Sequence, residues 1–422
     1  MADEKLVVRN VYKIFGEEPE RALDLLKQGY SKDEILKQTG QTVGVQDTSF
    51  NVHKGEIFVV MGLSGSGKST LVRMLNRLID PTAGEIYIDG DPITGTDMEN
   101  VRKIRLTKMS MVFQHFALFP HLTVAENVAY PLKIRGEDEK TRREKAMKSL
   151  EQVGLAYWAD RPPSALSGGM QQRVGLARGL CAEPEVLLMD EPFSALDPLI
   201  RADMQKELLE LQQAVHKTIV FITHDLDEAL ILGDRIAIMK DGWFVQVGTA
   251  QDIVSDPQDD YVAAFTQGID RGRVFTADWV MRDPIPLDLQ TDTAETALKK
   301  LDDNERDGLY VKNGNETAGV VTYGDVAHAF SKGETDLKRI LHTQYPTTRP
   351  RTLLHELYDP CSEGLPIAVL DDDGKLQGVV DPSEVFSMLV PDTELPSEKQ
   401  ARQQQDQAGT ASAGAGKAAA QA

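Results

Sequence analysis

The sequence predicts an α/β domain with a mainly parallel sheet, followed by a smaller α+β module that is internally duplicated. Segments of strand and helix character alternate up to about residue 267, which is typical of a mainly parallel sheet covered by helices. A glycine-rich loop at residues 62–69 joins an apolar strand to an amphipathic helix. After residue 271, two similar stretches of strand, turn, strand and helix follow one another, with corresponding glycines at Gly319 and Gly378.

The bulk composition of the 422 residues fits two or three folded domains, and a hydrophobic share of 41% supports buried cores. The formal net charge of −20 opposes general affinity for nucleic acid or for an anionic membrane face. We therefore interpret the acidity as favouring solubility and expect no nucleic-acid partner. Cys181 and Cys361 lie far apart in sequence, which fits a reducing compartment without a disulfide framework. We expect no signal peptide and no membrane span, so a membrane role would need another subunit to supply the span.

The N-terminal region predicts a strand, an inserted helical pair and a second strand. Residues 6–11 have strand character, and residues 17–42 form the insertion. Its first helix, residues 19–28, is amphipathic and stops before a glycine. Its second helix begins with a capping box between Ser31 and Glu34. Strand character returns at residues 43–52.

The phosphate-binding loop is the most specific motif, because it reads G-x-x-x-x-G-K-S between a strand at residues 57–61 and a helix at residues 70–79. The helix is predicted from Leu71, Met74, Leu75 and Leu78 at helical spacing. Glycines allow backbone N–H groups to turn toward phosphates, and the helix dipole favours the anion. The predicted nucleotide-binding residues of this segment are Gly62, Ser64, Gly65, Ser66, Gly67, Lys68, Ser69 and Thr70. Lys68 would reach the β- and γ-phosphates, and Ser69 would hold Mg²⁺.

A second motif of nucleotide hydrolases follows the apolar strand at residues 186–189. Asp190 at the strand end would orient Mg²⁺ through water, and Glu191 is placed to act as the general base toward the attacking water. An acidic strand end facing solvent would be the default interpretation without the phosphate-binding loop upstream.

The segment at residues 166–171 predicts a second anion-binding helix N-terminus, with Ser167, Gly168 and Gly169 opening a helix at residues 170–181. One ATP does not need two such sites from one chain. The economical geometry is a head-to-tail dimer in which this segment, including Gln171, caps the γ-phosphate held by the other copy.

Three single residues fit the same site. Gln114 follows a strand and could sense Mg²⁺ or the attacking water, His224 ends another buried strand and could contact the γ-phosphate, and Phe15 could stack on adenine. Each of them alone would be interpreted as an ordinary loop or core residue. No His/Cys cluster has metal-ligand spacing, and no G-x-S-x-G nucleophile motif is present.

Together these residues resemble the ATP-binding-cassette family. The phosphate-binding loop, Gln114, residues 166–171, Asp190 with Glu191, residues 194–197 and His224 occur in the family order over roughly residues 5–267. The resemblance implies an ATPase domain at residues 1–270 with an antiparallel β part and a helical subdomain, and ATP with Mg²⁺ as cofactors. It makes Phe15 the adenine-stacking aromatic, places Asp197 in a loop at the dimer interface, and lets Gln114 couple to a membrane subunit. It implies a homodimer at the cytoplasmic face of the plasma membrane, working with permease subunits and a substrate-binding protein.

The insertion and the run at residues 194–201 resemble a narrower group, the ATPase subunits of glycine betaine/proline betaine importers. The duplicated module at residues 271–391 resembles a tandem CBS pair, with repeats at about 276–333 and 337–391. In ligand-binding CBS units a Thr/Ser and an Asp after the last strand hold a nucleotide ribose, and Thr322 and Asp325 match this pattern. The second repeat departs from it, with Asp381 and Glu384 at these positions, and a purely structural dimerisation module is an equal alternative. Residues 392–422 are expected to be disordered.

Two alternatives to a betaine importer stay open at this stage. One is an importer for another small solute, such as an amino acid or polyamine, and the other is a soluble ATPase of the family without a transport role. For regulation, the basic residues of the duplicated module could meet an anionic membrane surface or an acidic partner face, or they could be solvated charges with no common target. These residues are Lys338, Arg339, Arg349 and Arg351.

Overall fold

The computed structural model describes residues 3–114, 117–194, 196–314, 316–390 and 396. The chain divides into two compact units, Met1–Phe265 and Thr266–Ala422, so the division lies a few residues before the boundary predicted after residue 270. The predicted tail at 392–422 falls, apart from Pro396, outside the described residues. Within the described part of the chain, no helix combines the length and the apolar character that a membrane crossing requires.

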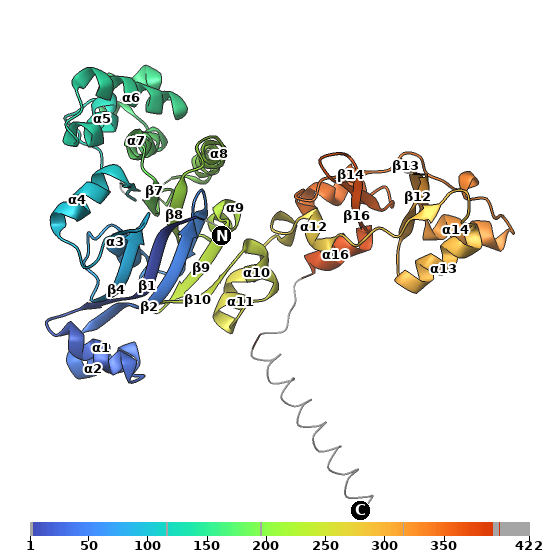
Figure 1. The fold of residues 1–422 in the computed structure, drawn as a ribbon, viewed down its shortest axis with the longest axis horizontal. Helices are drawn as coiled ribbons and strands as arrows, with labels where there is room; N and C mark the ends of the chain where they lie inside the picture. Colours follow the sequence, from blue (N-terminus) through green and yellow to red (C-terminus); the bar gives the residue numbers. More distant parts are fainter. Residues whose placement is uncertain (1–2, 115–116, 195, 315, 391–395, 397–422) are drawn as a thin grey trace, which may run out of the picture. The chain divides into compact units, whose positions relative to one another are not determined.

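The first unit is built on a six-stranded sheet in the order β10-β9-β3-β8-β7-β6 (Figure 1). Its neighbouring strands are parallel except for the antiparallel pair β9–β10, which confirms the mainly parallel sheet. The strands are β3 (Ile57–Met61), β6 (Met109–Val112), β7 (Val186–Asp190), β8 (Thr218–Thr223), β9 (Arg235–Lys240) and β10 (Trp243–Gly248). Because β3, β7 and β8 run parallel, their carboxyl ends meet at one edge of the sheet, where the phosphate-binding loop, Asp190, Glu191 and His224 follow them.

A second, antiparallel sheet of the first unit has the order β2-β1-β4-β5. Its strands are β1 (Glu4–Phe15), β2 (Thr42–His53), β4 (Ala83–Ile88) and β5 (Asp91–Pro92). The main core joins both sheets and α3, and the rings of Phe50 and Phe58 stack across it at 5.0 Å. The strand predicted at residues 6–11 was too short. A register shift between Val8 and Val11 and a positive φ at Asn10 interrupt the alternation, and the strand then continues to Phe15.

The insertion forms the two predicted helices, α1 (Pro19–Lys27) and α2 (Lys32–Thr39). The side chain of Ser31 accepts a hydrogen bond from the N–H of Glu34, and the Glu34 carboxylate accepts one from the N–H of Ser31, as the capping box predicts. The pair has a small core of its own, in which Ala22 and Ile35 are buried with residues of β1 and β2. The insertion is therefore anchored on the antiparallel sheet.

Helix α3 (Lys68–Leu75) is shorter at its C-terminal end than predicted. The helix was expected to reach residue 79, but it ends before Asn76, whose side chain accepts a hydrogen bond from the N–H of Leu78 at 3.1 Å. Arg77 has a φ of 54°, which no α-helix accommodates. Leu78 is consequently 51% exposed, although its spacing fits the apolar face of the helix.

Helices α4, α9 and α10 pack on strands of the parallel sheet, while α5, α6 and α7 pack against one another as a helical part (Figure 1). Helix α7 begins at Gly168, two residues before the predicted start, because Ser167 is its N-cap. The remaining helices are α4 (Met98–Thr107), α5 (Val124–Ile134), α6 (Glu139–Gln152), η1 (Ala156–Trp158), η2 (Pro163–Ala165), α7 (Gly168–Cys181), α8 (Pro198–Val215), α9 (Leu226–Leu232), α10 (Ala250–Ser255) and α11 (Asp260–Thr266).

The second unit contains two three-stranded sheets with the same topology, in agreement with the duplication. In each, a short first strand pairs in parallel with the second, and the second pairs antiparallel with the third. The strands are β11 (Leu287–Asp288), β12 (Gly308–Asn313) and β13 (Glu316–Thr322), then β14 (Thr347–Thr348), β15 (Ile367–Leu370) and β16 (Leu376–Val380). The helices are η3 (Arg271–Arg273), α12 (Ala277–Val280), α13 (Ala294–Asn304), α14 (Tyr323–Ser331), η4 (Leu337–Arg339), η5 (Leu354–Leu357), α15 (Tyr358–Cys361) and α16 (Pro382–Leu389).

The two repeats are not structurally separate, because segments of the first repeat bond to residues of the second. Arg282, which precedes the first repeat's strands, forms a bridge with Val379 of β16 in the second repeat. The hydroxyl of Tyr310 in β12 donates to the carbonyl of Pro366 at 2.6 Å. The first residues of the predicted repeat at 276–333 therefore lie against the second repeat.

Candidate nucleotide site

The phosphate-binding loop between β3 and α3 has a backbone that only glycine accommodates at two positions. Gly62 and Gly67 have φ values of 154° and 108°. A Cβ at Gly62 would lie 2.1 Å from the carbonyl oxygen of Met239, and one at Gly67 would lie 2.4 Å from that of Gly44. The loop is thus packed closely against the backbone of Met239 and Gly44, and its left-handed glycines fit a loop that turns N–H groups toward an anion.

Lys68 lies at the centre of this loop and is only 5% exposed. Its ammonium group donates to the carbonyl oxygens of Gly62 at 2.7 Å and Leu63 at 3.0 Å. Burial lowers the pKa of Lys68, and the nearby carboxylates of Asp190 and Glu191 oppose this shift. The direct hydrogen-bond partners of this buried cation are neutral carbonyls, which an anionic group such as a phosphate can replace.

Ser69 and Asp190 meet at the carboxyl edge of the sheet, although they come from different motifs. The hydroxyl of Ser69 donates to Asp190 Oδ1 at 3.1 Å, and Arg73 approaches Asp190 Oδ2 at 3.4 Å. A hydroxyl and a carboxylate beside a phosphate site are oxygen ligands of the kind that Mg²⁺ takes together with phosphate oxygens. The residues present therefore fit the predicted ion.

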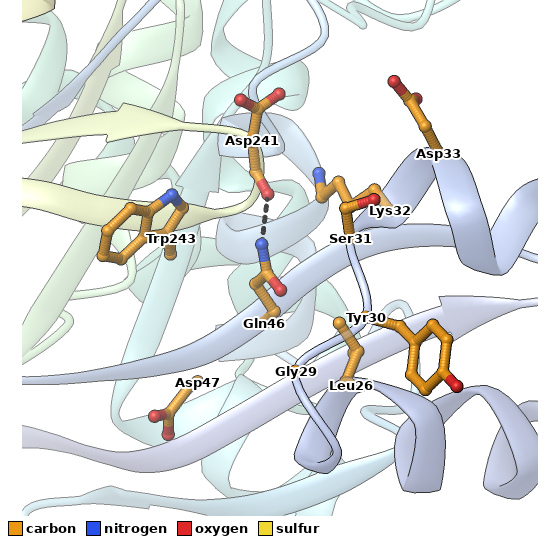
Figure 2. Close-up of a pocket in the computed structure, with 10 residues that line it drawn as sticks. All are labelled: Leu26, Gly29, Tyr30, Ser31, Lys32, Asp33, Gln46, Asp47, Asp241 and Trp243. Atoms are coloured by element: carbon orange, nitrogen blue, oxygen red, sulfur yellow. Dashed lines mark hydrogen bonds between the residues drawn. The ribbon is translucent and has the colours of Figure 1, made fainter.

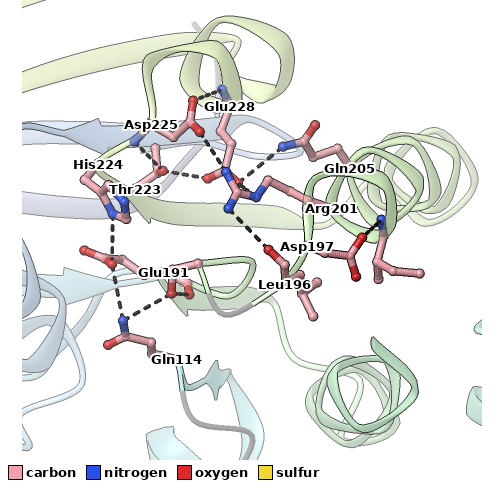
Figure 3. A network of polar contacts seen from close by, with 12 residues as sticks. Gln114, Glu191, Leu196, Asp197, Arg201, Gln205, Thr223, His224, Asp225 and Glu228 are labelled. Atoms are coloured by element: carbon pink, nitrogen blue, oxygen red, sulfur yellow. Dashed lines mark hydrogen bonds and ion pairs between the residues drawn. The ribbon is translucent and has the colours of Figure 1, made fainter. Parts of the chain in front are cut away.

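Glu191 lies beside the two other predicted polar residues of the site (Figure 3). Its Oε2 is 3.0 Å from Nδ1 of His224 and 3.4 Å from Nε2 of Gln114. Its own backbone has a φ of 46°, and its N–H donates to the carbonyl of Ile222 in β8 at 3.0 Å. The end of β8 therefore holds the backbone of Glu191, and the strained φ turns its side chain out of the strand direction.

Ser194 is a member of this group that sequence reasoning did not single out. Its hydroxyl accepts a hydrogen bond from Nε2 of Gln114 at 3.1 Å and donates to the carbonyl of Glu191 at 3.0 Å. It begins the Ser-x-x-Asp run that ends at Asp197, so the motif itself contained the signal.

Phe15 lies on the antiparallel sheet and reaches the phosphate-binding loop through one glycine. A Cβ at Gly44 would lie 2.8 Å from the Phe15 ring, and the carbonyl of the same Gly44 packs on Gly67. The ring is 41% exposed, and the ammonium of Lys13 lies 5.1 Å from its centre. An open aromatic face next to the loop fits the predicted stacking on a base.

The residues of the second predicted anion site have local partners. Ser167 Oγ accepts from the N–H of Met170 at 3.4 Å, and the Gln171 amide donates to carbonyls of residues 163 and 166. Asp197 caps α8 by accepting from the N–H of Ile200 at 3.1 Å. The chain thus brings together one group, comprising the phosphate-binding loop, Gln114, Asp190, Glu191 and His224. It presents residues 167–171 and Asp197 at separate helix starts.

A cavity of about 520 Å³ separates the insertion from strands β2 and β10 (Figure 2). Trp243 lines one side, Lys32 lies at the start of α2, and the Gln46 amide donates to the carbonyl of Asp241 at 2.9 Å. Burial lowers the pKa of Lys32. The adjoining N–H of Gly242 donates to the carbonyl of Ser66 at 2.8 Å, so this turn supports the rear of the phosphate-binding loop.

Known proteins similar to this chain cover most of its length. It is 49% identical over 379 residues to a glycine betaine transport ATP-binding protein of Bacillus subtilis, covering 89% of this chain and 90% of that protein. It is 48% identical over 387 residues to a glycine betaine/carnitine transport ATP-binding protein of Listeria monocytogenes, covering 91% and 97%. The chain belongs to the ABC transporter family.

The family model described as ABC transporter matches residues 45–194, which include the phosphate-binding loop and the Asp190 strand. A solved structure from Clostridium perfringens, described as part of an ABC transporter complex, matches with a TM-score of 0.51 and 26% identity. The match covers 61% of this chain and 92% of that one. The first unit therefore has the ABC-type ATPase fold, which binds nucleotide.

The second unit of this ABC transporter subunit places Thr322 and Asp325 at the start of α14. Thr322 Oγ1 donates to Asp325 Oδ2 at 2.6 Å and accepts from the Asp325 N–H, so the pair caps the helix. Asp325 Oδ2 also lies 2.7 Å from Nε2 of His342. Burial works to raise the pKa of Asp325, but the hydrogen bonds of Thr322 and His342 outweigh it and lower the pKa.

The corresponding acidic residues of the second repeat have arginine partners. Asp381 is 1% exposed and lies 3.3 Å from Arg306, while Glu384 pairs with Arg282. Burial raises the pKa of Asp381 to about 6, against the lowering influence of Arg306. At the positions where the first repeat has Thr322 and Asp325, the second repeat thus has acidic side chains that are paired with arginines of the same chain.

Two of the four basic residues considered for regulation, Arg339 and Arg349, have separate partners. Arg339 pairs with Glu334 at 2.7 Å, and Arg349 donates to the carbonyl of Asp371. These contacts favour local roles over one shared basic face.

Proposed function

We propose that the chain is the ATP-hydrolysing subunit of an importer for glycine betaine and related quaternary amines, acting at the cytoplasmic face of the membrane. The observation that carries the proposal is the 49% identity with the Bacillus subtilis glycine betaine transport ATP-binding protein over 90% of that protein. Both units of the chain contribute to this match, because it spans 89% of the chain. The importer would draw its membrane span from separate permease subunits and its solute from a substrate-binding protein.

ATP would bind with its base on Phe15 and its phosphates in the loop at residues 62–70. The ammonium of Lys68, held by carbonyls at 2.7 and 3.0 Å, would pair with the β- and γ-phosphates. Ser69, Asp190 and Gln114 would hold Mg²⁺. That ion would neutralise charge that develops on the phosphate oxygens during transfer.

Hydrolysis would use Glu191 as the group that orients and deprotonates the attacking water. The carboxylate oxygen that lies 3.0 Å from His224 is fixed by that imidazole, which leaves the other oxygen free to face a water. His224 would contact the γ-phosphate, and Gln114, 3.4 Å from the same oxygen, would report the state of the site to the permease.

Two copies of the chain would complete each site. Ser167, Gly168, Gly169 and Gln171 open a helix whose N-terminus would meet the γ-phosphate bound by the other copy. Asp197, at the start of α8, would lie at the same interface. Mixing Ser167→Arg chains with Lys68→Ala chains gives heterodimers with one intact site, so ATPase activity above that of either homodimer is expected. An inactive mixture would contradict the shared site.

The second unit would be a tandem CBS module that regulates transport. Thr322 and Asp325 would hold a nucleotide ribose, which requires the ligand to replace their mutual hydrogen bond of 2.6 Å. Nucleotide binding that survives Lys68→Ala and disappears on adding Thr322→Ala and Asp325→Ala supports this role. Binding that vanishes with Lys68→Ala alone assigns all nucleotide to the first unit.

The solute is tested by uptake into cells that depend on this subunit. Lys68→Ala should abolish uptake of labelled glycine betaine and leave uptake of labelled amino acids and polyamines unchanged. Lys54→Ala, at an exposed position outside the loop, is the control and should keep full uptake. Loss of amino-acid or polyamine uptake with intact betaine uptake would identify the other importer class.

A further inference from the structure

A buried polar network lies directly behind the loop that carries His224 (Figure 3). Thr223 Oγ1 at the end of β8 donates to Glu228 Oε2 at 2.6 Å and accepts from the N–H of Asp225 at 2.9 Å. Asp225 Oδ1 in turn accepts from the N–H of Glu228 at 3.3 Å. His224, between Thr223 and Asp225, is therefore the centre of a turn whose two flanking residues are both fixed by Glu228.

Helix α8 enters this network from the other side through Arg201. Its guanidinium pairs with Asp225 Oδ2 at 3.0 Å and approaches Glu228 Oε1 at 3.8 Å. It also donates to the carbonyl of Leu196 at 3.4 Å, and its own N–H donates to the carbonyl of Asp197 at 2.9 Å. One side chain thus touches both the His224 turn and the loop that leads to Asp197.

Glu228 is the most enclosed member, since it is 4% exposed and also accepts from the Gln205 amide at 3.3 Å. A buried carboxylate is retained only where donors and opposite charge offset its desolvation. Here Thr223 and Gln205 donate hydrogen bonds, and the Arg201 guanidinium lies 3.8 Å away as the opposite charge. Burial raises the pKa of Glu228 against these partners. A buried group held by partners on several elements fixes the geometry of those elements.

We propose that Glu228 and Arg201 are positioning residues for ATP hydrolysis, which tie the His224 turn to the Asp197 loop and so hold the imidazole of His224 against Glu191. This inference rests on the proposed roles of His224 and Asp197. Neither Glu228 nor Arg201 touches the nucleotide, because they lie behind the turn and act through His224. The tie also makes any displacement of the Asp197 loop, at the proposed interface with the second copy, a displacement of His224.

The test is a double-mutant cycle on the purified full-length chain. Glu228→Ala should lower kcat about tenfold or more with the KM for ATP nearly unchanged, because a displaced imidazole costs turnover rather than binding. Glu228→Gln, which keeps an acceptor for Thr223, should recover most of kcat. In a His224→Ala background, Glu228→Ala should cost no further activity, because its effect is transmitted by the imidazole.

Arg201→Ala provides a second entry to the same cycle if Glu228→Ala unfolds, and its effect should likewise disappear in the His224→Ala background. Glu56→Ala is the matched control, since Glu56 is also buried and pairs with Arg235 at 3.1 Å, but before β3 at the opposite strand ends. It should lower stability and keep kcat. Losses that multiply in the double variants, or no loss of kcat in Glu228→Ala, overturn the inference. A wild-type chain without ATPase activity defeats the proposed function as well, so the two failures are distinguishable.

Discussion

Strands β7 and β16 both lead into acidic residues, and the two ends differ in what faces the carboxylates. After β7, Glu191 lies 3.0 Å from the imidazole of His224 and remains at the open carboxyl edge of the sheet. After β16, Asp381 is 1% exposed and lies 3.3 Å from the guanidinium of Arg306. The same local pattern therefore produces a carboxylate at the sheet edge in one unit and a buried ion pair in the other.

The neighbouring contacts follow the same division. Gln114 offers Glu191 a neutral amide at 3.4 Å, whereas Glu384 in the second repeat is paired with Arg282. A carboxylate held by a side-chain amide and an imidazole differs from one paired with a guanidinium, because the guanidinium balances its charge in place. We expect the partner, rather than the position after a strand, to decide whether an acidic residue takes part in catalysis.

The largest expected effect is a difference in ATP turnover between variants at the end of β7 and variants after β16. Asp190→Asn should lower ATP turnover by about 100-fold or more, because the site loses a carboxylate beside Ser69 that is needed to hold Mg²⁺. Asp381→Asn should leave turnover within about twofold of wild type, because the carboxylate of Asp381 is paired with Arg306. Steady-state ATPase assays on both variants check this, and equal losses would remove the distinction between the two ends.

Local patterns in the sequence predicted much of this arrangement. The capping box of Ser31 and Glu34 and the strand at residues 57–61 are present as predicted, because each depends on residues close together in the chain. The predicted end of α3 was wrong. Leu78 fits the helical period, but the side chain of Asn76 and the positive φ of Arg77 stop the helix. Periodicity does not report such a competing turn.

The contacts that define the site and the module were beyond sequence reasoning. Arg306 and Asp381 come from different repeats, and Arg201 and Glu228 come from different helices. The order of the motifs did indicate that Glu191 would lie near other polar groups. The distances that decide its partners depend on how strands far apart in sequence pair.

The second prediction concerns the pH dependence of stability that Asp381, after β16, should cause. Because the folded-state pKa of Asp381 is raised to about 6 from 3.8, the folded chain retains this proton between about pH 4 and 6. The contribution of Asp381 to the free energy of unfolding is therefore fully present at low pH. It falls by about 3 kcal/mol as the pH rises through this window. Urea unfolding of wild type and Asp381→Asn across this range measures the difference, which should change with pH. A constant difference would contradict the assignment.

The first repeat provides the control for this pH dependence. The pKa of Asp325 is lowered, so its contribution is present at neutral pH and is lost as the pH falls below about 4. Asp325→Asn should therefore change the unfolding free energy with the opposite sign of pH slope to Asp381→Asn.

The smallest expected effect concerns the partly exposed pair of Glu384 and Arg282. Their side chains are 32% and 38% exposed, so solvent screens the attraction. Glu384→Gln should lower the unfolding free energy by at most about 1 kcal/mol and should not alter ATPase activity. Thermal unfolding monitors the first quantity. A loss of several kcal/mol would show that the pair closes the second repeat more firmly than its exposure suggests.

The central claim is that Glu191 is free to act on water while its counterparts in the second unit are not. Glu191→Gln keeps the shape of the side chain and removes the base, and it is best measured as single-turnover hydrolysis alongside ATP binding. The account predicts unchanged ATP affinity and a rate lowered by about 100-fold or more, with ATP trapped uncleaved. A Glu191→Gln chain that binds ATP and cleaves it at a near-normal rate would contradict the account.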